Sequence, residues 1–277
     1  MIIAFYYEQN GYGGVDTHMA HLFNHWPCDD DQFIVLSNPN NEGIDYLKSK
    51  LKKSNVNFYE INNGIFSNNE NYGNKLVKLF VFVKIQCLFL IKFPKILSQF
   101  KPDIFISNNG GYPGAITSFI AAIIGRIYRP TKNKTFFLIH HAPCGNFFLR
   151  KFADIYSVLI RFLSINIITV SEASKKALES ETPLEKIKFI YNGLEMPSEP
   201  LLPMSLKRQL NISNDRLIIG IIGPIDPHKG HDTILEAFKS SNFLQKFAHF
   251  VVVGKGRNNF VESLKEKVQN YDLGKNI

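Results

Sequence analysis

Lys229 stands where a cation and the start of a helix could bind the same anion. It lies in the segment GPIDPHKGHDTILEAF, residues 223–238, between a predicted strand that ends at Gly223 and a predicted helix that begins around His231. The first turn of a helix offers unpaired N–H groups and partial positive charge. The position therefore favours a phosphate, or a leaving diphosphate whose charge grows in the transition state. The alternative is a solvated lysine in a surface loop.

A glycine-rich turn near the N-terminus could hold an anion in a similar way. The segment GYGGVDTHMAHLF places Gly11, Gly13 and Gly14 between a predicted strand and a predicted helix, where backbone N–H groups and the helix dipole converge. The GxGxxG fingerprint would require glycine where Asp16 stands, and the chain has no GxxxxGK[ST] motif. A nucleotide-binding oxidoreductase is therefore disfavoured, and a plain tight turn is the alternative.

Two histidines end the predicted strand at 135–140. Ligands of parallel sheets bind outside the carboxyl ends of the strands, so His140, with His141 as the second candidate, is placed for a role in a site. A hydrogen-bonded structural histidine is the competing interpretation. A zinc site formed with Cys144 lacks a further ligand.

Apolar segments rich in Val, Ile, Phe and Tyr alternate with helical patterns along the whole chain. We predict strands at 2–7, 33–37, 56–61, 103–107, 135–140, 166–170, 186–191, 216–223 and 249–254. We predict helices at 15–26, 75–99, 114–127, 172–180 after an N-cap at Ser171, 231–241 and about 258–270. This alternation is typical of an α/β fold with parallel sheets and right-handed crossovers.

The segment GLEMPSEPLLPMS interrupts this alternation with three prolines and no periodicity, as expected of a linker. It separates a Rossmann-like domain at 1–195 from a second, incomplete Rossmann-like domain at 206–277.

Positive charge is concentrated in one part of the chain. Residues 71–153 carry twelve Lys and Arg side chains against one carboxylate, Asp103, a net charge of +11. Lysines interrupt the apolar residues of 74–97 too often for a membrane span. The segment therefore predicts a buried helix whose lysines reach water, a basic apolar surface that rests on anionic lipid, or both together. Nucleic acid is not expected, because no binding motif accompanies the charge.

The N-terminal residues and the cysteines indicate the cellular compartment of the protein. The first residues lack the basic and apolar regions of a signal peptide. Cys28, Cys87 and Cys144 are odd in number and widely spaced, so a disulfide framework is not expected. We expect a cytoplasmic protein, peripheral at most on the inner face of the cell membrane.

Several of these segments together resemble one enzyme family. IIGIIGPIDPHKGHDTILEAF followed by FVVVGKGRNNFVESL is similar to the donor-domain signature of glycosyltransferase family 4, whose members are GT-B enzymes that use nucleotide sugars. Upstream, GYGGVDTHMAHL, LIHH, ITVSEASKKAL and IYNGLE resemble, in family order, its first glycine loop, its post-strand histidine, its last N-domain strand and helix, and its hinge.

The resemblance implies a retaining, metal-independent transfer of a sugar, with no cofactor, from a nucleotide sugar to a saccharide or a lipid-linked saccharide. Assembly of cell-envelope polysaccharide or lipopolysaccharide is the implied pathway. The first domain would bind the acceptor and the second the donor. Gly13 and Gly14 would lie near the donor phosphates and His140 or His141 near the reacting sugar. Gly223 and Lys229 would contact the donor in the second domain.

Two departures from the family pattern bear on activity. Pro224 stands where the family commonly has an arginine that binds diphosphate, and the chain reaches Ile277 before the family's ExxxxxxxE motif. The resemblance therefore implies a truncated donor domain. The alternative function is that of a catalytically inactive fragment that binds an acceptor, a membrane or a partner subunit.

Overall fold

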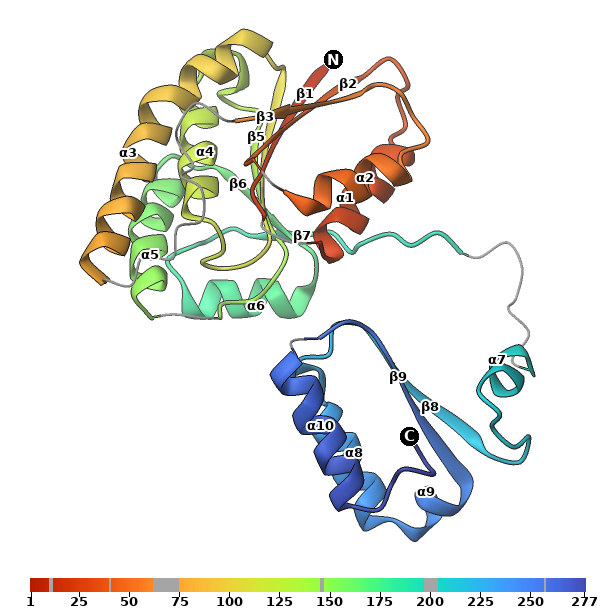
Figure 1. Ribbon diagram of the computed structural model, residues 1–277. Coiled ribbons are helices and arrows are strands. Elements are labelled where there is room, and N and C mark those ends of the chain that lie inside the picture. The colour runs from red at the N-terminus through yellow and green to blue at the C-terminus, as the bar shows by residue number, and fades with distance from the viewer. Residues whose placement is uncertain (10–11, 40, 62–74, 145–146, 197–203, 257) are drawn as a thin grey trace. The chain divides into compact units, whose positions relative to one another are not determined.

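The computed structural model describes residues 1–9, 12–39, 41–61, 75–144, 147–196, 204–256 and 258–277. The chain divides into two compact units, Met1–Glu195 and Met196–Ile277. In both units parallel strands pack against helices (Figure 1). The predicted α/β fold class is confirmed.

A parallel sheet of seven strands forms the centre of the first unit. Its strands follow the order β3-β2-β1-β4-β5-β6-β7. They are β1 (Ile2–Tyr7), β2 (Gln32–Ser37), β3 (Val56–Glu60), β4 (Ile104–Asn109), β5 (Thr135–Ile139), β6 (Asn166–Thr169) and β7 (Lys188–Phe189). All seven predicted strands are present, although the last keeps only two residues at the edge of the sheet.

The central strand β1 is buried on both faces because its side chains alternate between two cores. Phe5 and Tyr7 pack with α1 (Gly14–Asn24) and α2 (Glu42–Lys50), whereas Ala4 and Tyr6 pack with α3 (Lys75–Phe100) and α4 (Ile116–Ile127). Figure 1 shows the two pairs of helices on opposite sides of the sheet. Burial on both faces explains why these strands are continuous apolar segments instead of alternating ones.

Two further helices complete the first unit, after a 3-10 turn at Arg129–Thr131. They are α5 (Phe147–Phe162) and α6 (Glu172–Glu181), and Ser171 caps α6 as predicted by accepting from the Ser174 N–H at 3.1 Å. Neither α2 nor α5 was predicted. In α5, phenylalanines such as Phe148 and Phe162 are exposed while Ser157 is buried, so this amphipathic helix departs from the usual arrangement of apolar side chains inside and polar side chains outside.

The second unit has a sheet of two parallel strands, β8 (Leu217–Ile222) and β9 (Ala248–Val253). Its helices are α7 (Met204–Gln209), α8 (His231–Ser240), α9 (Asn242–Phe247) and α10 (Asn258–Asn270), with a 3-10 turn at Pro227–Lys229. The predicted strands and helices are all present. Helix α9 was not predicted, and α7 begins inside the predicted linker, of which residues 197–203 lie outside the described residues.

One face of the two-stranded sheet is covered. Figure 1 shows α8 and α10 on the same side of β8 and β9, and Leu235, Phe238, Phe250 and Leu264 form the buried core between them. The side chain of Ile222 is 86% exposed. Within the described parts of both units, no helix combines the length and the apolar character needed to cross a membrane.

Candidate functional site

The strand order of the first unit marks the carboxyl ends of β1 and β4. The order reverses there, because β2 and β3 extend the sheet from β1 while β5, β6 and β7 extend it from β4. Ligands of open parallel sheets bind outside the strand ends at such a switch point. The side chains that follow β1, β4 and β5 are therefore the candidates for a site.

His140 follows β5 and is held from two sides. Its backbone N–H donates to the Asn109 carbonyl at 3.1 Å, and its Nε2 lies 2.8 Å from Asn108 Oδ1. Burial, together with repulsion from His18 and His141, lowers the pKa of His140 to about 3. The imidazole is therefore neutral at pH 7. Because Nε2–H donates to the amide oxygen, Nδ1 keeps a lone pair that can accept a hydrogen bond.

The surroundings of His140 include a free donor. The amide nitrogen of Asn108 is buried and has no hydrogen-bond partner within the described residues. The ring of His18, from α1, lies edge-on to His140 at a centroid distance of 5.0 Å, and burial lowers the pKa of His18 as well. His141, the second candidate, is exposed. The strand end thus offers a neutral acceptor and an amide donor side by side.

The glycine turn after β1 is arranged around a buried carboxylate. The N–H of Gly13 donates to Asp16 Oδ2 at 2.7 Å, and the Tyr7 hydroxyl donates to the other oxygen of the same carboxylate. Gly14 is exposed and begins α1, while Gly11 lies outside the described residues. The N–H of Gly13 is therefore engaged within the protein, and Gly14 is the open position of the turn.

Glu8 is a candidate that the sequence did not indicate. It directly follows β1, and its carboxylate accepts from the Tyr6 hydroxyl at 2.8 Å and from the Thr117 hydroxyl of α4. Burial raises the pKa of Glu8. The only signal in the sequence was an acid directly after an apolar strand, and the partner in α4 stands 109 positions away.

In the second unit, the segments that follow β8 and β9 lie backbone to backbone. The N–H of Gly223 donates to the Val253 carbonyl at 2.9 Å, and that of Ile225 donates to the Lys255 carbonyl at 3.0 Å. A Cβ atom on Gly254 would lie 1.8 Å from the carbonyl oxygen of Gly223. Only glycine allows this approach, and Gly223 itself has a φ of 143°, which also favours glycine.

Lys229 closes the 3-10 turn directly before α8. Its N–H donates to the Asp226 carbonyl at 3.0 Å, and Gly230, with a φ of 79°, leads the chain into the helix. The Lys229 side chain is exposed, and its ammonium group has no partner in the described part of the chain. The first turn of α8 contains one acid, Asp232, which is paired with Lys267 at 2.7 Å. The lysine and the helix N-terminus are thus both available to an anion.

His231, which the sequence showed only as the start of a helix, holds this turn from beneath. It is buried, and its Nδ1 lies 3.3 Å from the Asp226 carbonyl. Its Nε2 has no partner among the described residues. His231 therefore links the base of the turn to α8.

A group of side chains that could hold a metal ion was also missed. Within the described residues it consists of His21, His25 and Glu195. The alternative set considered from the sequence, which was His140, His141 and Cys144, forms no such group. The histidines of α1 were visible as an i,i+4 pair, but their acidic partner lies 170 positions further along the chain.

Comparison with known families classifies the second unit. Residues 205–277 match the family model described as glycosyl transferases group 1. No curated protein sequence matches the chain. The match covers less than half of the chain and includes the Lys229 turn.

Solved structures share the fold over the whole chain. HepE from Anabaena, solved in complex with UDP and glucose, has a TM-score of 0.65 at 16% identity, over 100% of this chain and 68% of its own. WaaG, a glycosyltransferase involved in lipopolysaccharide biosynthesis, has a TM-score of 0.60 at 11% identity, and the match covers 98% of this chain and 68% of WaaG. UDP-GlcNAc 2-epimerase from Neisseria meningitidis, bound to UDP-GlcNAc, has a TM-score of 0.50 at 15% identity, over 98% and 70%.

At these identities the likeness establishes the fold, and the predicted GT-B-like architecture is confirmed. The chain spans about two thirds of the length of these proteins. Transferases and an epimerase share the fold, so the fold alone does not select the reaction. The family-model match on the second unit supports the predicted glycosyltransferase.

Proposed function

We propose that the chain forms part of a retaining, metal-independent glycosyltransferase that moves a sugar from a nucleotide sugar to a saccharide or a lipid-linked saccharide. One observation carries the proposal. The segment that matches glycosyl transferases group 1 presents Lys229 directly before α8, exposed and without a partner for its ammonium group among the described residues. The binding of UDP by HepE, which has the same fold, supports a nucleotide-sugar donor.

In the second unit, Lys229 and the first turn of α8 bind the diphosphate of the donor. When the bond between the anomeric carbon and the diphosphate oxygen breaks, its electron pair remains on that oxygen. A nearby ammonium group and helix N–H groups stabilise this charge. Gly223 directly follows β8 on the approach to the turn, and Pro224 adds no charge there. Lys229 therefore supplies the positive charge beside the departing diphosphate.

In the first unit, His140 positions a sugar. Its neutral imidazole accepts a hydrogen bond from a sugar hydroxyl through Nδ1, and the free amide N–H of Asn108 donates one. A pKa of about 3 makes His140 a weak proton acceptor at neutral pH. This supports a role in orienting the substrate, while the acceptor hydroxyl oxygen bonds to the anomeric carbon and its proton passes to the departing diphosphate oxygen. The exposed His141 is the alternative. In the glycine turn, Gly14 is better placed than Gly13 to approach a phosphate.

A surface of the first unit suits an anionic membrane. Helix α5 exposes a stripe that includes Phe148, Ile155 and Phe162, with exposed fractions of 74%, 62% and 83%. Helix α3 lies beside it, because Phe82 contacts Phe152 at a centroid distance of 5.4 Å, and α3 exposes further apolar side chains. Both helices fall within or next to the segment of charge +11. Apolar side chains framed by lysines are typical of proteins that rest on anionic lipid.

This surface favours a lipid-linked acceptor, and with it a place in cell-envelope polysaccharide or lipopolysaccharide assembly. The involvement of WaaG in lipopolysaccharide biosynthesis supports the same pathway. The protein would then act on the inner face of the membrane, where it binds without spanning the bilayer.

Titration calorimetry with UDP and GDP tests the donor site. We expect Lys229→Ala to weaken binding about tenfold, since it removes one charge-assisted contact. Lys265→Ala is the matched control, because Lys265 is an exposed lysine of the same unit that pairs with Glu262. Transfer of labelled sugar from UDP- and GDP-sugars to envelope-lipid acceptors should fall with the same variant. Equal affinities and equal rates in the two variants would contradict the proposed site.

A further inference from the structure

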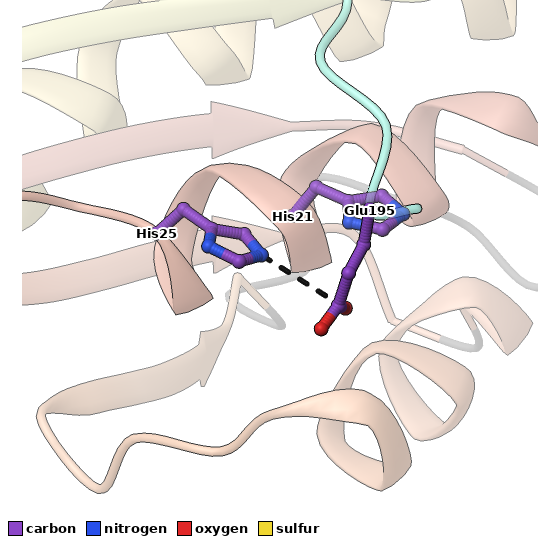
Figure 2. A group of neighbouring side chains, drawn as sticks. All are labelled: His21, His25 and Glu195. Carbon is purple, nitrogen blue, oxygen red and sulfur yellow. Dashed lines mark ion pairs between the residues drawn. The ribbon is translucent and has the colours of Figure 1, made fainter. Parts of the chain in front are cut away.

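Three ligating side chains meet at the far end of α1 from the glycine turn. His21 lies in the last turn of α1 and His25 is its C-cap residue, four positions further along, so the two side chains lie on one side of the helix end. Glu195 is the last residue of the first unit. Figure 2 shows its side chain reaching across to the two imidazole rings. One ligand atom from each residue lies within 4.8 Å of the other two, and Glu195 Oε2 is 3.9 Å from His25 Nε2.

The ligand atoms are close to the spacing that a metal requires. In a tetrahedral site with bonds of about 2.1 Å, ligand atoms lie about 3.4 Å apart. The two rings are nearly parallel, at an interplanar angle of 16° and a centroid distance of 6.3 Å. Shifts of about 1 Å, which small side-chain rotations supply, would complete the geometry. His25 and Glu195 are about half exposed, so these rotations meet little resistance.

Lys52 already pairs with Glu195 and must be taken into account. Its ammonium group lies 3.0 Å from Oε1 and 3.3 Å from Oε2. The oxygen that faces His25 is Oε2, and the nearer partner of the lysine is Oε1. One carboxylate can therefore bind a metal through Oε2 while Oε1 keeps the lysine. The competing charge lowers the affinity without blocking the site.

We propose that His21, His25 and Glu195 bind a transition-metal ion such as Zn²⁺ or Ni²⁺. Imidazole with carboxylate selects such borderline ions over Mg²⁺ and Ca²⁺, which prefer sets of oxygen ligands. Three protein ligands leave a fourth position to water. A hollow of about 420 Å³ adjoins the group and is lined by His18, Trp26 and Tyr191 among others, so there is room for that ligand.

The site would act as a clamp. Glu195 lies in the segment that follows β7. The first residue of this segment, Ile190, donates its backbone N–H to the Thr169 carbonyl of β6. A metal bond would add an attachment between this segment and α1, directly before the linker, to the ion pair that Glu195 makes with Lys52. Metal binding would thus fix where the linker leaves the first unit. This role is separate from the proposed sugar transfer, which uses other residues.

Metal titration of the full chain tests the site. The three cysteines are exposed and would bind Zn²⁺ themselves, so all three are first replaced by serine. On that background we expect His25→Ala and Glu195→Gln to weaken Zn²⁺ and Ni²⁺ binding at least tenfold, and Lys52→Ala to strengthen it. Mg²⁺ should give no heat. The matched controls are His249→Ala, which changes a histidine of β9, and Glu185→Gln, which changes a glutamate paired with Arg161.

Equal Zn²⁺ affinity in the control and ligand variants would overturn the proposal, as would an absence of binding. Circular dichroism of each variant checks that the fold is retained, which the exposure of these side chains leads us to expect. A chain that binds the metal ion but no sugar nucleotide would contradict the proposed function and leave the proposed metal site supported.

Discussion

The two units share the same alternation of strands and helices but differ in how much of their sheets the helices cover. In the first unit, seven strands have helices on both faces, and side chains such as Phe5, Tyr6 and Phe119 are fully buried. In the second, two strands have helices on one face, and Ile222 is 86% exposed. A parallel sheet is stable when both faces are covered. The pattern of elements therefore sets the fold class, while the number of strands sets how much core results.

Large core truncations should separate the two units most clearly. Phe119→Ala and Phe238→Ala each remove a side chain of 0% exposure and should each cost about 3–5 kcal/mol. The first unit should remain folded after this loss, whereas the second, with its smaller core, should unfold. Amide hydrogen exchange at increasing urea concentrations measures the unfolding of each unit separately.

Ile222→Ala is the control, since its exposed side chain should change the free energy of unfolding by less than about 0.5 kcal/mol. Survival of the second unit with Phe238→Ala would show that burial on one face suffices, and the contrast between the units would fail.

Acid should destabilise the first unit through His140. The pKa of this buried imidazole is lowered to about 3, below its unfolded value of about 6.5. The unfolded state therefore binds the proton first as the pH falls. The stability that His140 contributes is complete above about pH 6.5 and is lost toward pH 3, with about 3 kcal/mol gone by pH 4.

The difference in unfolding free energy between wild type and His140→Gln, followed from pH 7 to 4, measures this effect. His141→Gln is the matched control, because its side chain is exposed. If both variants follow the wild-type profile in parallel, His140 is not the group that titrates.

Lipid binding should belong to the first unit alone. Phe148→Ser with Phe162→Ser should lower the affinity for anionic vesicles, measured by co-sedimentation, at least about 30-fold, because each change removes apolar surface worth about 1–2 kcal/mol when buried in lipid. Phe243→Ser in the second unit, where the side chain is 61% exposed, should have no effect. Added salt should also weaken binding. Equal binding to neutral vesicles would rule out the electrostatic part of the proposal.

Helix caps should give the smallest difference. Ser171 caps α6 and Ser241 caps the six-residue α9. Ser171→Ala should cost about 1 kcal/mol, whereas Ser241→Ala should cost a few tenths, because a short helix loses little when it frays. Thermal unfolding followed separately for each unit measures both. A larger cost at Ser241 would indicate that α9 stabilises the second unit more than its burial suggests.

The sequence predicted the strands well because a strand buried on both faces is itself an apolar segment. Helix α5 was missed although Arg150, Asp154 and Arg161 recur along it at helical spacing, and its apolar side chains Phe148 and Phe162 lie on an exposed face. Of the candidate site, the sequence placed Lys229 and His140 at element ends, where local pattern decides position. It could not show that Asp16 occupies the N–H of Gly13, because such contacts depend on how the turn closes.

The same limit applies to contacts between distant residues. Glu8 meets Thr117 only because β1 and α4 pack together, and Glu195 meets His25 only because the segment after β7 crosses α1. No local pattern encodes either pair.

The close approach of Gly254 to the Gly223 carbonyl has a further consequence for ligand affinity. Two backbone hydrogen bonds fasten the start of the Lys229 segment to the segment after β9 before any ligand arrives. The conformational entropy of that stretch is lost during folding, so an arriving anion does not have to order it. A residue larger than glycine at 254 would push the two segments apart and transfer that entropy loss to the binding step. Affinity for the anion would then fall even though no group that touches it had changed.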